Sequence, residues 1–275
     1  LEPIRALYEA EGLPVPKCYG CDERGEIAWL EDVGDRTLRD AIAEASPEQR
    51  ASLLAAACDL IPRIQSIAAP PGGVAAFDRH LDDALLAYKA ELFSSWVLPG
   101  ARDAPQPGDR GAVAAAFAVA ARAAAEAPQR LAHRDFQSAN LHVVPGRGLV
   151  MIDLQGAFLA PPEYDLVCLL RDSYIDVSED ECLHACDRIR TLLPDVPEPD
   201  AFARRFDLLT IARKGKDLAR FLYAAGARGD DRYLRYVGPT VARLLGAAER
   251  AAERDPEIAS FASLCRRIRE TPCVR

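Results

Sequence analysis

The sequence lacks any apolar run that approaches the roughly 20 residues needed to span a bilayer. The closest segment, GAVAAAFAVAARAAAEA at 111–127, is interrupted by Arg122 and Glu126 and predicts a buried helix of a soluble protein. The chain opens LEPIRALYEA, with charges and no long apolar stretch, so no signal peptide is apparent. We therefore expect a cytoplasmic protein with no membrane partner. Because the first residue is Leu1 and not Met, we also expect residues upstream of it.

A basic surplus is also lacking. The 34 Lys and Arg residues are outnumbered by 42 Asp and Glu residues, which gives a net charge of −8. Binders of nucleic acids or of membrane surfaces need a basic footprint, so neither is expected as a partner. The length of 275 residues, 49% of them hydrophobic, allows a substantial core, organised as one large domain or as one domain with part of another.

Eight cysteines raise the question of a metal or redox site. Cys18-Tyr-Gly-Cys21 has the spacing of a metal knuckle, and Cys182 and Cys186 are one helical turn apart with His184 between them. Neither pair repeats the two-knuckle spacing of a zinc ribbon, and the first pair does not open a helix as a thioredoxin-like motif would. We favour reduced, mostly buried thiols over a zinc site or a redox site.

The hydrophobic pattern changes from helical to extended at a few places. Apolar spacing of 3.6 residues predicts helices over 1–11, 38–45, 47–69, 76–97 and 111–127, and again after residue 164 to about residue 269. The segments KCYGC and IAWLE predict a hairpin around the polar turn DERGE at 22–26, and LEDVGDRTL at 30–38 predicts a strand that leads into a loop. The runs LHVV at 141–144 and LVMID at 149–153 predict a second hairpin around PGRG.

The stretch HRDFQSAN at 133–140 then lies between a buried helix and a hairpin. Asp135 and Asn140 are five residues apart, and Asp153 ends the hairpin. Phosphoryl transfer needs a carboxylate that accepts or orients the proton of the attacking hydroxyl, and hard oxygen ligands for Mg²⁺. A pattern of Asp and Asn alone occurs by chance in many loops, but the preceding His133-Arg134 and the strand end at Ile152-Asp153 favour a phosphoryl-transfer centre. His133 is interpreted as a packed loop anchor and not as a base.

Several segments resemble one known group of proteins. HRDFQSANLHVV, GLVMIDLQ and PEYDLVCLL are similar to the aminoglycoside phosphotransferase/choline kinase superfamily. LEDVGDRTL, ELFSSWVLP, YDLVCLLRDSY and LARFLYAAGARGDDRYLRYVGP resemble, within it, the bacterial anomeric kinases of cell-wall recycling that act on N-acetylmuramate and N-acetylglucosamine. The resemblance implies an α+β, protein-kinase-like bilobal fold, with residues 1–33 as the remainder of a truncated N-lobe and residues 34–275 as a mostly helical C-lobe.

The resemblance also implies roles for individual residues. Asp135 would be the catalytic base, Asn140 and Asp153 would bind Mg²⁺, and Asp165 would brace the catalytic loop, a role compatible with a helix N-cap. The resemblance implies cofactor contacts at Leu30, Glu31, Asp32 and Val33, the hinge that meets the adenine of ATP, and at Glu2, the partner of a phosphate-binding lysine. Candidate substrate contacts are Gln137, Arg171 and Asp172. Arg171 and Arg213 are the candidates for binding a muramate carboxylate, but a surface or salt-bridged position is favoured for each.

The chain departs from the family pattern in three respects. No glycine-rich loop and no strand lysine precede Glu2, Gly156 stands where a second carboxylate is common, and Gln137 replaces a histidine frequent in the sugar kinases. The resemblance implies an ATP- and Mg²⁺-dependent kinase of an amino sugar, acting as a monomer or weak dimer.

Two alternatives remain open. One is an aminoglycoside or choline kinase, with Asp172, Asp176, Asp180 and Glu181 facing a cationic substrate. The other is a kinase-like binding protein without activity, which the missing phosphate-gripping loop would suit. The presence of Asp135, Asn140 and Asp153 together speaks against this second alternative.

Overall fold

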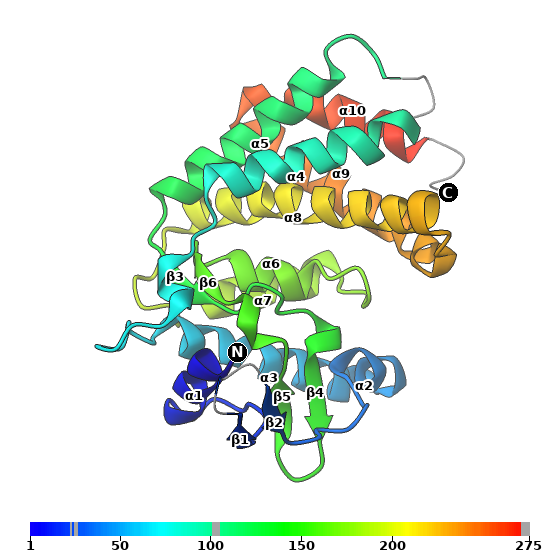
Figure 1. The fold of residues 1–275 in the computed structure, drawn as a ribbon. Coiled ribbons are helices and arrows are strands. Elements are labelled where there is room, and N and C mark those ends of the chain that lie inside the picture. The colour runs from blue at the N-terminus through cyan, green and yellow to red at the C-terminus, as the bar shows by residue number, and fades with distance from the viewer. Residues whose placement is uncertain (23, 25–26, 101–104, 271–275) are drawn as a thin grey trace. The chain divides into compact units, whose positions relative to one another are not determined.

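A computed structural model describes residues 1–22, 24, 27–100 and 105–270 of the chain (Figure 1). Part of the predicted polar turn at 22–26 and Cys273 lie outside the described residues. Within the described part of the chain, no helix is long and apolar enough to cross a membrane. The chain folds into two compact units, Leu1–His80 with Pro128–Pro197 and Leu81–Ala127 with Glu198–Arg275. The division into lobes at residues 33 and 34 stays a prediction.

The first unit combines helices with three antiparallel strand pairs. β1 pairs with β2, β3 with β6, and β4 with β5. The helices are α1 (Glu2–Ala10), α2 (Leu38–Glu44), α3 (Pro47–Gln65), α6 (Tyr164–Leu170) and α7 (Glu179–Arg190). The strands are β1 (Cys18–Cys21), β2 (Ala28–Leu30), β3 (Arg130–Ala132), β4 (Leu141–Val144), β5 (Gly148–Met151) and β6 (Phe158–Ala160). Helix α3 contacts β3, α6 and α7, and its buried face includes Leu54, Ile61 and Ile64.

Helix starts in this unit follow from local sequence signals. Thr37, Ser46 and Ser178 each form a capping box, in which the hydroxyl accepts from the backbone of the third helical residue and that residue's side chain reaches back. Such boxes satisfy two backbone donors that a helix end would otherwise leave without partners. Pro47 follows Ser46 at the first helical position, where the missing N–H costs nothing.

The second unit is built from helices. They are α4 (Asp83–Trp96), α5 (Asp109–Glu126), α8 (Pro199–Arg228), α9 (Val237–Arg254) and α10 (Ala259–Arg269). Helix α8 contacts α4, α5 and α9. The core of this unit holds the rings of Phe93, Phe117 and Phe261, with centroids 5.6–6.4 Å apart. Gly215 on α8 makes room for them, since a Cβ there would lie 2.9 Å from the Phe117 ring.

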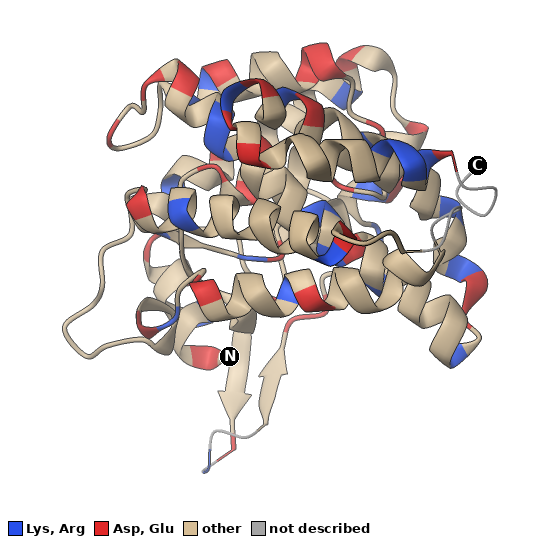
Figure 2. Cartoon of the chain, turned by 90° about the horizontal axis from the view of Figure 1, so that it is seen from above, with Lys and Arg blue, Asp and Glu red and all other residues tan. Residues whose placement is uncertain are grey.

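Charged residues of both signs are spread along the helices (Figure 2). Many are paired locally. In the first unit Arg50 of α3 binds Glu181 of α7 at 3.0 Å, and in the second Arg204 of α8 binds Asp255 at 2.7 Å. Such part-exposed pairs contribute little stability each.

The structure confirms most predicted elements, corrects three boundaries and adds one strand pair. The helix expected over 76–97 begins only at Asp83, because Asp82 caps it with a 2.8 Å bond to the amide of Leu85, and residues 75–78 form a 3-10 turn instead. The helix expected over 47–69 ends at Gln65. LEDVGDRTL is extended only as far as Leu30, where β2 ends. The pair β3–β6 was not expected, since both of its strands are three residues long.

Candidate active site

The loop that follows β3 is held by a buried carboxylate. Asp165 lies in the first turn of α6 and is 1% exposed. Its Oδ2 accepts a 2.7 Å hydrogen bond from the amide of His133, and its Oδ1 accepts a 3.0 Å bond from the amide of Arg134. The thiol of Cys168, one turn further along α6, donates to the Arg134 carbonyl at 3.3 Å. Helix α6 therefore fixes the backbone immediately before Asp135.

A second buried carboxylate holds the other end of the loop. Asp172 follows α6 and accepts bonds from the amide and the hydroxyl of Ser138 at 2.8 and 2.6 Å, and from the amide of Tyr174 at 3.0 Å. Asp172 is 3% exposed and Ser138 is fully buried. Sequence reasoning placed Asp172 among candidate substrate contacts. This geometry favours a positioning role instead, because the carboxylate is engaged by two donors of Ser138 in the loop and by the amide of Tyr174.

Two residues of the site have left-handed backbone angles. Arg134 has φ of 79° and Asp153 has φ of 63°. They are the two non-glycine residues with positive φ in the described part of the chain, and such angles are uncommon for residues with a Cβ. Conformations of this kind persist only where surrounding contacts hold them, and they gather at functional sites. Here Arg134 directly precedes Asp135, and Asp153 is itself one of the predicted metal ligands.

His133 links the loop to the second hairpin. Its ring is fully buried, and Nε2 lies 2.9 Å from the carbonyl oxygen of Ile152. Because a carbonyl only accepts, this contact requires a proton on Nε2. Desolvation lowers the pKa of His133 below its usual value, which keeps the ring neutral. The imidazole is thus a fixed donor that ties the strand end before Asp153 to the loop, as the sequence interpretation expected of a packed anchor.

Asp135 lies in the middle of the loop, and its side chain is half-buried. Its backbone carbonyl accepts from the amide of Gln137 at 2.8 Å and from Asn140 Nδ2 at 2.9 Å. Its Oδ2 lies 3.7 Å from the position that a Cβ on Gly156 would occupy. The residue that replaces the family's second carboxylate is therefore a direct neighbour of Asp135.

Asn140 and Asp153 meet at the base of the β4–β5 hairpin. Asn140 Nδ2 lies 3.4 Å from Asp153 Oδ2, and the amide of Ile152 donates to the Asn140 carbonyl at 3.0 Å. Asp153 is exposed, and its Oδ1 accepts from Gln155 Nε2. An amide oxygen and a carboxylate are hard donors, and Mg²⁺ takes one or two such protein ligands and fills its other positions with phosphate and water. The pair therefore fits a magnesium ion.

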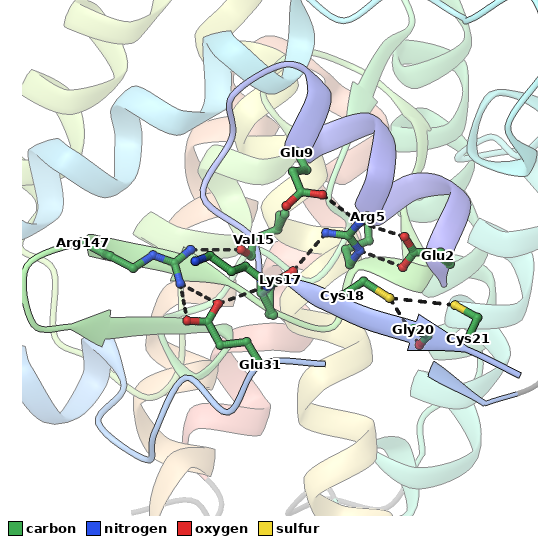
Figure 3. A network of polar contacts seen from close by, with 11 residues as sticks. Glu2, Arg5, Glu9, Val15, Lys17, Cys18, Gly20, Cys21, Glu31 and Arg147 are labelled. Atoms are coloured by element: carbon green, nitrogen blue, oxygen red, sulfur yellow. Dashed lines mark hydrogen bonds and ion pairs between the residues drawn. The ribbon is translucent and has the colours of Figure 1, made fainter. Parts of the chain in front are cut away.

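The predicted hinge Leu30–Val33 lies beside the same hairpin. The Glu31 amide donates to the Lys17 carbonyl at 2.8 Å, and the Glu31 carboxylate binds Arg147 at 2.6 Å (Figure 3). Hydrogen bonds from Arg147 and from the amide of Lys17 lower the pKa of Glu31. His142 Nδ1 lies 2.7 Å from the Gly34 carbonyl oxygen. These contacts hold the segment after β2 against β4 and β5.

The remaining candidate residues lie in other surroundings. Glu2, at the start of α1, is bound by Arg5 Nε and Nη2, both at 2.7 Å, and the Arg5 hydrogen bond lowers the pKa of Glu2. Arg171 is 3% exposed and forms a two-pronged pair with Glu179 at 2.5 and 2.8 Å. Arg213 of α8 is also buried, with Asp217 at 3.5 Å. Burial and pairing of both arginines disfavour their use for a muramate carboxylate.

Sequence reasoning missed two polar residues of the site, Ser138 and Gln155. Ser138 belongs to the site because its hydroxyl donates a hydrogen bond to Asp172. Asp172 is 34 residues further along the chain, so no local sequence pattern reveals the contact. Gln155 follows the proposed metal ligand by two positions, and its carbonyl accepts from Arg79 at 3.0 Å. Its proximity to Asp153 was the one signal that could have identified it.

The chain resembles known proteins over most of its length. Residues 3–205 match the model of the phosphotransferase enzyme family. The N-acetylmuramate/N-acetylglucosamine kinase of Pseudomonas aeruginosa is 27% identical, over 95% of this chain and 75% of that protein. The protein of the same name from Caulobacter vibrioides is 31% identical, over 83% of this chain and 64% of that protein. The chain thus spans about two thirds to three quarters of these relatives.

Solved structures share the fold. Choline kinase LicA from Streptococcus pneumoniae has a TM-score of 0.57 and 17% identity, with 94% of this chain and 79% of that chain covered. A choline/ethanolamine kinase family protein from Mesorhizobium loti has a TM-score of 0.59 and 13% identity, with 97% and 82% covered. These likenesses establish an α+β, protein-kinase-like fold. Together with the match over residues 3–205, they show that the chain belongs to the phosphotransferase enzyme family.

Proposed function

We propose that this chain transfers the γ-phosphate of ATP to a hydroxyl of an amino sugar, with the anomeric hydroxyl of N-acetylmuramate or N-acetylglucosamine as the first candidate. The proposal is supported by one chain of contacts. Asp165 accepts from the amides of His133 and Arg134 just before Asp135, and Asn140 bonds to the Asp135 carbonyl and lies 3.4 Å from Asp153. The names of the curated relatives support the choice of acceptor.

The three residues divide the chemistry among them. Asp135 accepts or orients the proton of the attacking hydroxyl, for which a half-buried carboxylate on a rigid loop is suited. Asn140 and Asp153 hold Mg²⁺, and the ion, when bound, neutralises charge on the phosphates. His133, held neutral by desolvation, positions the loop and takes no proton from the substrate.

The nucleotide is assigned to the segment around the first hairpin. The backbone of Leu30–Val33 meets adenine, and Glu2 orients a lysine that grips the phosphates. The pairs that Glu31 forms with Lys17 and Arg147 support a rigid hinge at this place. We further propose that the protein works in the cytoplasm as a monomer or weak dimer and serves cell-wall recycling.

Two of the four acidic residues considered for a cationic acceptor form structural contacts. Glu181 completes the capping box of α7 and binds Arg50, while the carboxylate of Asp172 is occupied by Ser138 and Tyr174. Of the four acidic side chains considered for choline or an aminoglycoside, these two are therefore engaged inside the fold.

The second alternative, a binding protein without catalysis, is disfavoured. The chain has strained backbone at Arg134 and Asp153 together with all three polar side chains of the proposed site.

The test is phosphate transfer from labelled ATP with Mg²⁺, using the complete gene product. The acceptors are N-acetylmuramate, N-acetylglucosamine, kanamycin and choline. Asp135→Asn should reduce turnover by roughly 10²–10⁴-fold, since it removes the proton acceptor, while leaving nucleotide affinity nearly unchanged. The matched control is Asp187→Asn, which makes the same change on the exposed side of α7 in the same unit.

Product on either sugar, lost in Asp135→Asn and kept in Asp187→Asn, would support the proposal. Product on kanamycin or choline alone would preserve the loop chemistry and reject the amino sugar. An Asp135→Asn variant as active as the wild type would reject the role of Asp135. ATP binding without transfer to any acceptor would favour a binding protein.

A further inference from the structure

The first hairpin places two thiols on the same side of a strand. Side chains three residues apart in a regular strand point to opposite faces. In β1 the pairing with β2 shifts between Cys18 and Gly20, so that one extra residue is inserted. Such a bulge reverses the alternation beyond it. As a result the Cys18 and Cys21 sulfur atoms lie 3.8 Å apart (Figure 3).

A carboxylate from a different element completes the group. Glu2, on the first turn of α1, offers an oxygen that lies within 4.8 Å of both sulfurs, as the sulfurs do of each other. Within the described residues this is the one group of three acidic, cysteine or histidine side chains with such spacing. The Glu2 carboxylate has a fixed position, because both of its oxygens accept hydrogen bonds from buried Arg5 at 2.7 Å (Figure 3).

The separation of the sulfurs matches a metal better than a disulfide. Two thiolates bound to tetrahedral Zn²⁺ at about 2.3 Å lie about 3.8 Å from each other. A disulfide requires about 2.05 Å between sulfurs. The contact between Arg5 and Glu2 has the form of the outer partners that orient ligands around metals. Cys21 is exposed and Cys18 half-buried, so an ion from solvent can reach both.

We propose that Glu2, Cys18 and Cys21 form a binding site for a thiophilic divalent cation, with Zn²⁺ as the first candidate. Binding displaces one proton from each thiol, and the fourth tetrahedral position takes water. The bound ion joins the start of α1 to the β1–β2 hairpin. It therefore stabilises this part of the fold, and its affinity falls as the pH is lowered. The site shares Glu2 with the proposed nucleotide contacts, so its test measures metal affinity and not phosphate transfer.

The test is a Zn²⁺ titration of the reduced, complete gene product against a chromophoric chelator, together with Co²⁺ absorption spectra. We expect one ion per chain, with a thiolate-to-metal band and tetrahedral d–d bands. Cys18→Ser and Cys21→Ser should each lower the affinity by more than about 100-fold, and Glu2→Gln by about 10–100-fold. Thermal unfolding with and without Zn²⁺ should show a rise in Tm only for the wild type and the control.

The matched control is Cys186→Ser, which removes one thiol of the other closely spaced pair, on α7. It should keep the ion and both spectral bands. Circular dichroism of each variant before addition of metal separates loss of a ligand from loss of fold. The proposal is overturned if the wild type binds no stoichiometric Zn²⁺, if Cys186→Ser loses it, or if Glu2→Gln binds as tightly as the wild type. Formation of a Cys18–Cys21 disulfide without any metal binding after reduction would also overturn it.

Discussion

The side-chain amide of Asn140 lies 3.4 Å from the carboxylate of Asp153, although thirteen positions separate them in the chain. The β4–β5 hairpin brings them together, since Leu141 pairs with Met151 and the next amide, that of Ile152, bonds back to the Asn140 carbonyl. The two side chains therefore flank the open end of a two-stranded ribbon. The proposed metal ion would bind both side chains at this end of the ribbon.

Replacing Asp153 with Asn should lower the apparent affinity for Mg²⁺ more than it changes any other property. The substitution keeps the size of the side chain but removes the charge that attracts a hard cation. We expect the Mg²⁺ concentration for half-maximal activity to rise at least about tenfold. The measurement is activity as a function of Mg²⁺ at saturating ATP. An unchanged Mg²⁺ dependence, with Asp187→Asn as the control, would remove Asp153 from the metal site.

Replacing Asp165 with Asn should both destabilise the fold and slow turnover. Each carboxylate oxygen accepts one backbone amide, from His133 or from Arg134, and an Asn places an NH₂ group against one of them. A buried donor left without an acceptor costs about 1–3 kcal/mol of unfolding free energy. Urea denaturation measures this loss, and kinetics measures turnover. A variant with wild-type stability and reduced activity would show that Asp165 does not brace the loop.

The sequence was sufficient where contacts are local. A short loop and a 3-10 turn connect Asp135 to Asn140. A four-residue turn closes the hairpin that precedes Asp153. Two short apolar runs on either side of a turn signal predict such a hairpin. The start of the helix expected at residue 47 was likewise correct.

The sequence was insufficient where distant segments meet. The pairing of β3 with β6 and the bond from Ser138 to Asp172 depend on packing between segments far apart in the chain. The start of α4 was misplaced because apolar residues continue upstream of Asp82, and only the hydrogen bond from Leu85 to Asp82 shows where the helix begins. Likewise a bulge in a four-residue strand leaves no periodic signal, so the knuckle spacing of Cys18 and Cys21 did not by itself show that the two thiols meet.

The burial of His133 should appear in the pH dependence of stability. Its folded pKa lies below the usual 6.5 because of desolvation. Below pH 6.5 the unfolded chain therefore binds a proton that the folded chain does not, and the unfolding free energy falls as the pH drops toward the folded pKa. Comparison of wild type with His133→Gln between pH 7.5 and about 5 should show a smaller slope in the variant. Equal slopes would mean that folding does not shift the pKa of His133.

Gly156 offers a way to alter Asp135 without touching it. A Cβ at Gly156 would lie 3.7 Å from Asp135 Oδ2, an ordinary contact, and the backbone there does not have positive φ. Gly156→Asp should therefore fold, and it restores the carboxylate that is common at this position in the family. The new negative charge disfavours ionisation of Asp135, so the acid limb of the pH profile of kcat/KM should move up by about one pH unit. Gly156→Asn, which has the same shape without the charge, should leave the limb in place. Because the effect is a repulsion near the surface, added salt should reduce the shift. Identical profiles for the Asp and Asn variants would mean that the ionisation of Asp135 does not control the reaction.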